Sequence, residues 1–386
     1  MSLALFFGVL VILLVLTVPI CVSFAFATLL PSLVSSDFPY TADAAVRSMV
    51  SGLNNFPLLA IPLFIIAGVI MAKGKISERL FNVFSYFIGN KTAGLPCAVT
   101  ITCLFYGAIS GSGPATTAAV GSMCIPLLTS VGYDLTFATA LVAVSGGLGI
   151  IIPPSIPYIM YCNAAGTSIS ELFLAGLLPG VLIALCLMIY SYVYCKVHGE
   201  DKDKLNAQWR ELRAKGLVTV LKEGFWALMS PVIILGGIYG GICSPTEAAT
   251  VSIFYSLIIS LFVYRSIKIR DLPKIILEGV HSYAPILIIL SAAVAFARVI
   301  TLMNVASIVS EAVLSTISSK VVILLLINVL LLIVGSWVSG TIAGRHENAD
   351  GGFMNFLFTA SANFDIVFAA GSIFMFSSII GFIGFY

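Results

Sequence analysis

Long runs without a charged side chain dominate this chain. A helix needs roughly 20 apolar residues to cross a bilayer, and the runs that approach or exceed this length are 2–36, 48–72, 92–133, 135–170, 172–195, 224–246, 248–264, 279–297, 321–344 and 366–386. Within these runs the apolar residues do not alternate with polar ones, which favours helices over the strands of a membrane barrel. The first run lacks a basic segment before its apolar stretch and predicts a retained first membrane helix.

Composition sharpens this prediction. Hydrophobic residues make up 60% of the chain and charged residues only 9%, against roughly 25% charged residues in soluble domains. We therefore expect an all-α polytopic membrane protein whose main surroundings are a lipid bilayer. The net charge of +2 gives no reason to expect a nucleic-acid partner, because the positive residues lie in short loops.

The positive residues predict the orientation of the chain. Seven Lys and Arg residues occur in 196–222 and four more in 265–274, so both segments are predicted to be cytoplasmic. Leucines and Trp209 recur with amphipathic spacing in 196–222. This segment is therefore either a surface helix that links two halves or a solvated linker.

Two of the apolar runs are interrupted by small and kinked residues. The sequence Ser110-Gly111-Ser112-Gly113-Pro114 lies at the centre of 92–133, which is too long for one helix. We predict a re-entrant hairpin with its tip there. Pro153-Pro154 interrupts 135–170 in the same way and predicts a broken helix. Unpaired backbone at membrane depth is tolerated only inside protein or beside a cavity, and such breaks are typical of binding sites in secondary transporters.

The chemistry of these breaks suits ions. Backbone carbonyls and the hydroxyls of Ser110, Ser112, Thr116 and Thr117 are hard oxygen ligands for sodium, and free N–H groups at half-helix N-termini suit a carboxylate. Gly111 and Gly113 allow a tight turn, and Pro114 can begin the outgoing arm. The alternative is a packing interface of small residues, which the prolines make less favourable.

The chain also resembles itself at an offset of 226 to 229 residues. Pro19 corresponds to Pro245, Gly52 to Gly279, Lys91 to Lys320, and Ser110-Gly111 to Ser339-Gly340. This order predicts a first repeat over 1–195, a linker over 196–222 and a second repeat over 223–341. An odd number of crossings between the copies would invert the second, which gives an inverted-repeat fold with paired hairpins.

Several of these segments together resemble the large membrane subunit of tripartite ATP-independent periplasmic (TRAP) transporters, the dicarboxylate type in particular. The resemblance covers residues 1 to about 341 in family order, and the matching pieces are Leu59–Gly68, Ser110–Thr116, Gly132-Tyr133-Asp134, Ile152–Ile156, Ser168–Gly180 and Ser244–Ala249. The resemblance implies sodium-coupled import of a small organic acid across the bacterial inner membrane, and neither an enzyme nor a cofactor beyond the sodium ion. It further implies two partners, which are a periplasmic substrate-binding protein and a small membrane subunit.

The resemblance also implies a shared sodium and substrate region. Its candidate residues are Ser110, Gly111, Ser112, Gly113, Pro114, Thr116, Pro153, Pro154, Ser155, Ser339, Gly340 and Thr341, with sodium at Ser110 and Ser112.

The C-terminal segment departs from the family pattern. Arg345, His346, Glu347 and Asp350 stand where apolar residues belong, and 342–386 lacks a second proline pair. Charges at membrane depth would cost several kcal/mol each. A shifted reading frame or a decayed gene would explain this, and a remodelled end is the alternative. Two alternatives to an active permease therefore stay open. The chain is either an inactive or partner-binding remnant of such a subunit, or a passive anion channel.

Two further positions carry open alternatives. Ser244-Pro245-Thr246-Glu247 has the spacing of a helix capping box, so Glu247 has either this structural role or a role in transport. Arg298 interrupts an apolar run and either meets a substrate carboxylate or extends its charge to the membrane surface.

Overall fold

The computed structural model describes residues 3–16, 18–34 and 38–316 together with Ser319, Val322, Ile323 and Leu326. All regular structure in these residues is helical. The second-repeat candidates Ser339, Gly340 and Thr341, and the segment 342–386, lie outside them.

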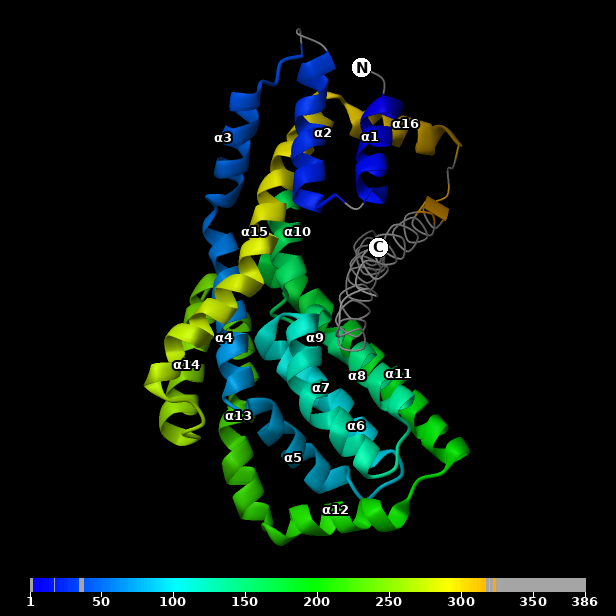
Figure 1. Cartoon of the computed structure of the whole chain (residues 1–386), viewed down its shortest axis with the longest axis vertical. Coiled ribbons are helices and arrows are strands. Elements are labelled where there is room, and N and C mark those ends of the chain that lie inside the picture. The colour runs from blue at the N-terminus through cyan, green and yellow to red at the C-terminus, as the bar shows by residue number, and fades with distance from the viewer. Residues whose placement is uncertain are drawn as a thin grey trace.

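The N-terminal run contains two helices, so the prediction of a single first membrane helix is wrong. Helix α1 covers Leu3–Val15 and α2 covers Ile20–Val34, and the two pack against each other (Figure 1). Pro19 lies between them. A proline lacks an N–H donor and moves the preceding residue away from helical geometry, which explains the break.

The run 48–72 is also divided. Helix α3 (Ala42–Leu53) ends before Asn54-Asn55, a short 3-10 turn covers Phe56–Leu59, and α4 covers Ala60–Lys73. The Asn pair and Pro57 provide the interruption. The side chain of Thr41 caps α3 by accepting a hydrogen bond from the N–H of Ala44 at 3.3 Å.

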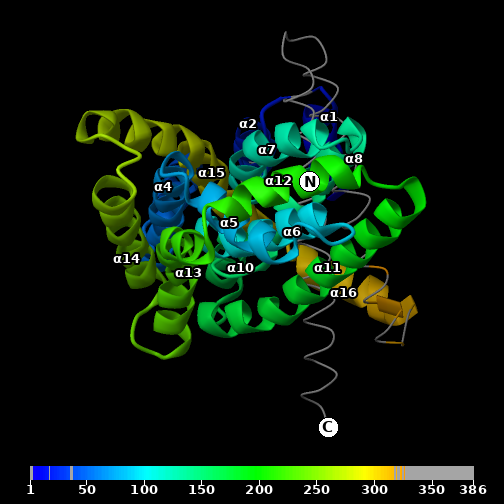
Figure 2. The same ribbon diagram turned by 90° about the horizontal axis from the view of Figure 1, so that it is seen from below.

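The predicted hairpin is present as two helices joined by a two-residue turn. Helix α5 covers Ile76–Ile88, α6 covers Gly94–Ser110 and α7 covers Gly113–Ser130. The helix break predicted at Ser110–Pro114 is thus confirmed. Helix α6 is largely buried and lies between α5 and α11 (Figure 2), so the hairpin occupies the interior of this half.

The break at Pro153-Pro154 is confirmed as well. Helices α8 (Leu135–Gly146) and α9 (Leu148–Ile151) precede it, and α10 (Ile156–Ala165) follows it. The long helix α11 covers Ile169–His198.

The linker is helical. Helix α12 covers Lys202–Ala214 and crosses the lower end of the molecule between α11 and α13 (Figure 1). It buries Leu205 and contacts α5, so the helical alternative is the observed one. Its relation to a membrane surface stays a prediction.

The remaining elements begin with α13 (Leu217–Tyr239) and α14 (Pro245–Ile258), which continues as a π-helical turn over Ile259–Val263. A 3-10 turn (Ile269–Asp271), the 31-residue helix α15 (Leu272–Leu302) and α16 (Val305–Thr316) follow. The capping box at Ser244 is confirmed: the Ser244 hydroxyl accepts from the Glu247 N–H at 3.3 Å, and the Ser244 N–H donates to the Glu247 carboxylate at 2.7 Å.

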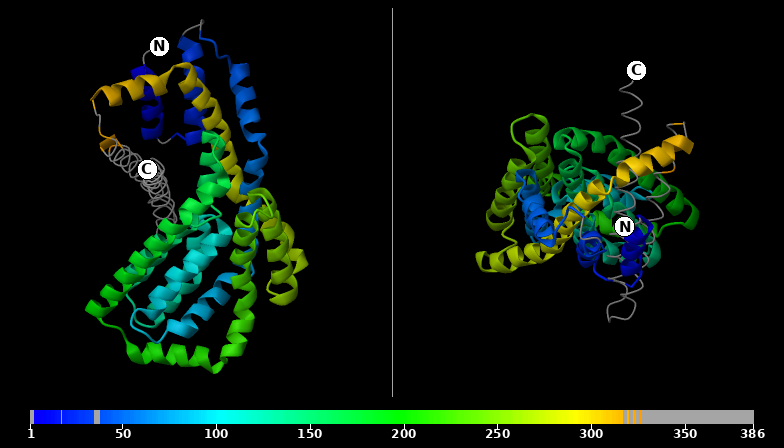
Figure 3. Two further views of the ribbon diagram at one scale, coloured as in Figure 1. Left: turned by 180° about the vertical axis from the view of Figure 1, so that it is seen from behind. Right: turned by 90° about the horizontal axis from the view of Figure 1, so that it is seen from above.

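Helix α15 packs along the N-terminal helices. It runs beside α3 and α4 (Figure 3) and also packs on α2. Phe6 and Phe24 both stack on Phe296 of this helix, with ring centroids 5.3 and 4.9 Å away.

Within the described residues, six helical stretches are long and apolar enough to cross a membrane. They are Phe56–Lys73, Leu135–Ala165, Ile169–His198, Leu217–Tyr239, Pro245–Val263 and Ile269–Leu302.

Candidate functional site

The hairpin tip is built from local rules. Ser110 is the last residue of α6, and Gly111 follows it with φ +63°, a left-handed conformation that suits glycine. Ser112 then caps α7, because its hydroxyl accepts from the N–H of Ala115 at 3.5 Å. Gly113 and Pro114 form the first turn of α7, where the missing N–H of proline has no cost.

Three hydroxyl and carbonyl oxygens meet at this tip. The hydroxyls of Ser110 and Thr116 lie 2.9 Å apart, and the Thr116 hydroxyl also donates to the carbonyl of Ser112 at 2.8 Å. Ser110 and Thr116 are both essentially inaccessible to solvent. The tip therefore presents buried, uncharged oxygen atoms.

The second break carries a similar cap. The Ser155 hydroxyl accepts from the N–H of Tyr158 at 3.4 Å and donates to the carbonyl of Ile150 at 2.5 Å. The bond between Pro153 and Pro154 is cis.

The two breaks are in direct contact. The N–H of Ile156 donates to the carbonyl of Gly111 at 3.3 Å, although the two residues belong to different helix pairs. A methyl group at Gly111 would lie only 2.7 Å from the carbonyl oxygen of Pro154. Glycine is therefore needed here both for its backbone conformation and for the close approach of the second break.

Glycines outside the motif make the same approach possible, and sequence reasoning did not single out their role. A methyl group at Gly149 would lie 2.4 Å from the Thr116 hydroxyl, and one at Gly107 would lie 2.5 Å from the Cα of Gly149. Gly146 packs on Thr117 in the same manner. Recurrent glycines in apolar helices are the available signal for such contacts, but they do not name the partner helix.

The structure thus places part of the predicted site in one region. The residues gathered there are Ser110, Gly111, Ser112, Gly113, Pro114, Thr116, Pro153, Pro154 and Ser155. Carbonyl and hydroxyl oxygens are the ligand types that a hard cation requires.

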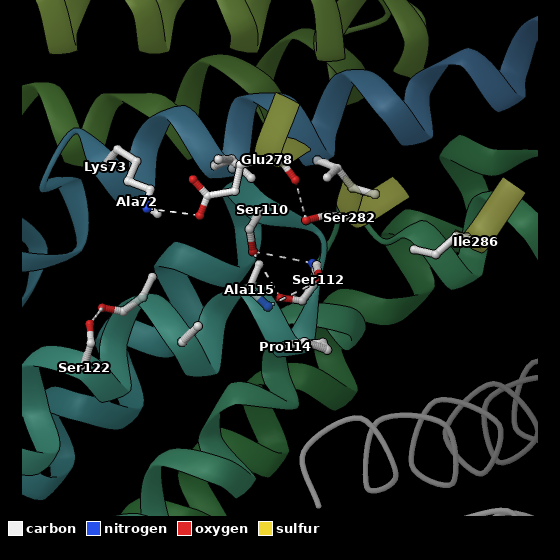
Figure 4. A pocket seen from close by; sticks show the side chains of 15 residues that line it. Ala72, Lys73, Ser110, Ser112, Pro114, Ala115, Ser122, Glu278, Ser282 and Ile286 are labelled. Atoms are coloured by element: carbon white, nitrogen blue, oxygen red, sulfur yellow. Dashed lines mark hydrogen bonds and ion pairs between the residues drawn. The ribbon is translucent and has the colours of Figure 1, made fainter. Parts of the chain in front are cut away.

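A cavity of about 530 Å³ opens beside the tip. It is bounded by α4, α6, α7 and α15, and its polar lining residues are Lys73, Ser110, Ser112, Ser122, Glu278 and Ser282. Figure 4 shows Lys73 and Glu278 facing each other above the serines of the tip; their charged groups lie 3.0 Å apart. Both side chains are about half exposed, at 49% and 47%.

The charges of this cavity were not predicted. Lys73 and Glu278 only bound apolar runs in the sequence, and nothing in the pattern brings positions 73 and 278 together. Arg298, for which the sequence leaves open a substrate contact or a charge extended to the membrane surface, is exposed on α15 and is not among the residues that line this cavity.

Comparison with known proteins gives a consistent result. Residues 7–343 match the family model described as the tripartite ATP-independent periplasmic transporter, DctM component. The chain is 40% identical to an isethionate TRAP transporter permease protein, DctMQ, of Oleidesulfovibrio alaskensis, over 87% of this chain and 52% of that protein. It is 37% identical to the C4-dicarboxylate TRAP transporter large permease protein DctM of Pseudomonas aeruginosa, over 76% of this chain and 68% of that protein.

A sialic acid TRAP transporter permease protein, SiaT, of Haemophilus influenzae is 33% identical over 77% of this chain and 47% of that protein. The chain therefore spans about half the length of some of the curated relatives that it matches. The family match covers most of the chain, and the resemblance first noted in its motifs is confirmed. This chain belongs to the DctM component family of TRAP transporters, and it is a large permease subunit and a multi-pass membrane protein rather than an enzyme.

Proposed function

We propose that this chain couples sodium entry to the import of a small organic acid, with a periplasmic binding protein and a small membrane subunit as partners. The contact between the two helix breaks carries the proposal. It gathers the Ser110 and Thr116 hydroxyls with the backbone of Gly111 and Ser112 in buried surroundings. A sodium ion bound by these oxygens would hold the end of α6 and the start of α7 in one arrangement beside the second break, so its binding would favour one conformation of the tip.

The adjacent cavity supports an anionic substrate. Its volume of about 530 Å³ lies in the range of pockets that hold small molecules. The N-terminus of α7 points its positive dipole end toward this side, and Lys73 supplies a full positive charge. The relatives are named for isethionate, C4-dicarboxylates and sialic acid, which is consistent with a small organic acid here. We propose that the Lys73 ammonium group leaves its ion pair with Glu278 and pairs with a carboxylate of the substrate when the substrate binds.

The proposed inverted repeat is supported by reciprocal contacts. Helix α16 begins 229 residues after α5 (76 and 305), and α14 begins 225 residues after α2 (20 and 245). Helix α15, the counterpart of α3 and α4, packs on α2, while α14, the counterpart of α2, packs on α4. Such an exchange of partners is what a two-fold relation between copies requires.

A double variant at the two breaks tests the sodium site. Ser112→Ala with Pro154→Ala removes the cap of α7 and loosens the second break. We expect sodium-dependent uptake by the full chain, produced with its two partner proteins, to fall at least tenfold at equal protein level. Pro126→Ala with Ser130→Ala is the matched control, because both residues are exposed on α7 away from the tip.

The outcomes separate the alternatives. Unchanged sodium-dependent uptake in the double variant would refute the site. Uptake that neither saturates nor needs sodium would instead favour a channel. Sodium-dependent thermal stabilisation of the purified chain without uptake would favour an inactive subunit that retains the ion site.

A further inference from the structure

The N-terminus of hairpin helix α6 lacks a cap of its own. Ala93 occupies the cap position with φ +57°, and no neighbouring side chain accepts a hydrogen bond from the first turn. Free N–H groups at a helix start need an acceptor when they are buried, and Ala93 is fully buried. The acceptor comes from far along the chain: the Ala93 N–H donates to Oε1 of Glu200 at 2.9 Å.

The same carboxylate oxygen holds the other arm of the hairpin. The Tyr133 hydroxyl donates to Oε1 of Glu200 at 2.5 Å. Tyr133 follows α7, and its N–H closes the end of that helix by donating to the carbonyl of Leu128 at 3.0 Å, after Gly132 turns the chain with φ +100°. Burial and the bond to Glu200 raise the pKa of Tyr133, so its hydroxyl stays a donor.

Glu200 also directly precedes Asp201, the cap residue of α12. Asp201 caps α12 by accepting from the N–H of Lys204 at 3.2 Å, and this bond lowers the pKa of Asp201. Farther along α12, the indole N–H of Trp209 donates to the carbonyl of Tyr86, the residue near the end of α5, at 3.1 Å. The linker is therefore fixed to the hairpin at one end and to α5 along its length.

We propose that Glu200 is a positioning residue that joins both feet of the hairpin to the start of α12. The feet are the two ends of the hairpin that lie farthest from its tip, at Ala93 before α6 and at Tyr133 after α7. The arms have 17 and 18 residues, or about 25 Å at 1.5 Å per residue. Because packed helices move as stiff bodies, fixing both feet keeps the tip at Ser110–Pro114 against Pro154. The hairpin and the start of α12 then move together. Only the importance of the tip for transport rests on the proposed function.

Hydrogen exchange tests the contacts of Glu200 with Ala93 and Tyr133 without any transport assay. We compare Glu200→Ala, Glu200→Gln and Tyr133→Phe with the control Asp203→Ala in the full chain in lipid nanodiscs. Asp203 is an exposed carboxylate three residues away, so its removal changes the charge equally. We expect at least tenfold faster exchange at 93–97 in Glu200→Ala, substantial rescue in Glu200→Gln, which keeps an acceptor oxygen, and no change in Asp203→Ala.

A second readout follows the tip itself. Ala115 lines the cavity, and the labelling rate of Ala115→Cys by a maleimide, read by mass spectrometry, reports access to it. We expect Glu200→Ala to raise this rate at least threefold and Glu200→Gln to restore it. Tyr133→Phe removes one hydroxyl and replaces Glu200→Ala in this experiment if that variant does not fold. It should raise the labelling rate by a smaller factor.

Two results would overturn the proposal. One is unchanged exchange at 93–97 in every Glu200 and Tyr133 variant. The other is faster exchange at 93–97 with an unchanged labelling rate of the thiol introduced at position 115, which would leave Glu200 as a local cap that does not position the tip. The effect of sodium on labelling of the Ala115→Cys chain with Glu200 intact tests the proposed function separately.

Discussion

At the scale of single residues, Gly111 has two independent reasons to be glycine. A side chain there would be strained by φ +63° and would also meet the carbonyl oxygen of Pro154 at 2.7 Å. Gly166 allows the backbone strain to be measured without the close contact, because it has φ +68° and no atom lies within 4 Å of a methyl group added there.

We predict that Gly166→Ala lowers the free energy of unfolding by about 1 kcal/mol, the strain alone, and leaves uptake intact. Gly111→Ala should cost at least twice as much and reduce uptake, because backbone atoms cannot move aside as a flexible side chain can. Thermal unfolding of the purified variants measures the difference. Equal losses at both positions would mean that the two breaks are not in contact.

Lys73 offers a prediction about substrate binding. Its ion pair with Glu278 is half exposed, so the pair itself contributes only about 0.2–1 kcal/mol to stability. We expect Lys73→Gln to leave the unfolding temperature within about 2 °C of the parent, since such a small loss shifts it little. The substrate concentration for half-maximal uptake should rise at least fivefold.

Lys75→Gln is the control, because Lys75 is exposed near Lys73 and its ammonium group lies 4.0 Å from the Glu78 carboxylate, its one ion pair among the described residues. An equal change in both lysine variants would mean that Lys73 acts through general charge and not through contact with the substrate.

At the scale of elements, the serine cap of α14 has two bonds to its glutamate carboxylate that are not found at the cap of α11. Ser168 accepts from the N–H of Glu171 at 3.4 Å. Ser244 accepts from Glu247 in the same way and also donates its own N–H to the Glu247 carboxylate.

We predict that Ser244→Ala lowers the free energy of unfolding by about 1 kcal/mol, and that Ser168→Ala lowers it by less. The reason is that the Glu247 carboxylate loses its hydroxyl partner as well. Thermal unfolding of both variants in one detergent gives the comparison. A larger loss for Ser168→Ala would contradict the contribution of the bond between the Ser244 hydroxyl and the Glu247 carboxylate.

Sequence predicts helix breaks well in this chain and predicts helix partners poorly. Proline, glycine and hydroxyl residues act within a few positions, so the breaks at Ser110–Pro114 and Pro153-Pro154 were visible. The break at Pro19 is harder to predict, because the charge-free run 2–36 reads as continuous and contains one proline at this point. The contacts of Glu200 with Ala93 and Tyr133 join positions 107 and 67 residues apart, and no local pattern records such distances.

At the scale of the whole molecule, the two copies of the proposed repeat cross through a pair of corresponding glycines. Gly52 of α3 faces Val294 of α15, and Gly279 of α15 faces Ile66 of α4. The Ser291 hydroxyl also donates to the carbonyl of Met49 at 3.0 Å. Gly52 of α3 thus meets residue 294 of α15, whereas the later residue Ile66 of α4 meets the earlier residue 279. The two chain segments therefore run antiparallel, as an inverted repeat requires.

This crossing predicts a compensating pair of substitutions. A methyl group at Gly52 would lie 2.6 Å from Cγ1 of Val294, and a β-branched side chain has little freedom to turn away. Gly52→Ala should therefore lower the free energy of unfolding by about 1–3 kcal/mol. Val294→Ala alone should cost about 1 kcal/mol through lost packing.

The double variant should be less destabilised than the sum of the two, because the methyl group added at position 52 would occupy the space that the Val294 side chain leaves. Gly236→Ala controls for helix propensity: nothing lies within 4 Å of its added methyl group, so it should be neutral or stabilising. Gly279→Ala, whose methyl group would meet Ile66 at 3.1 Å, should fall between these limits. If the losses at Gly52 and Val294 simply add, α3 and α15 do not meet at this point, and the antiparallel crossing that supports the inverted repeat would have to be abandoned.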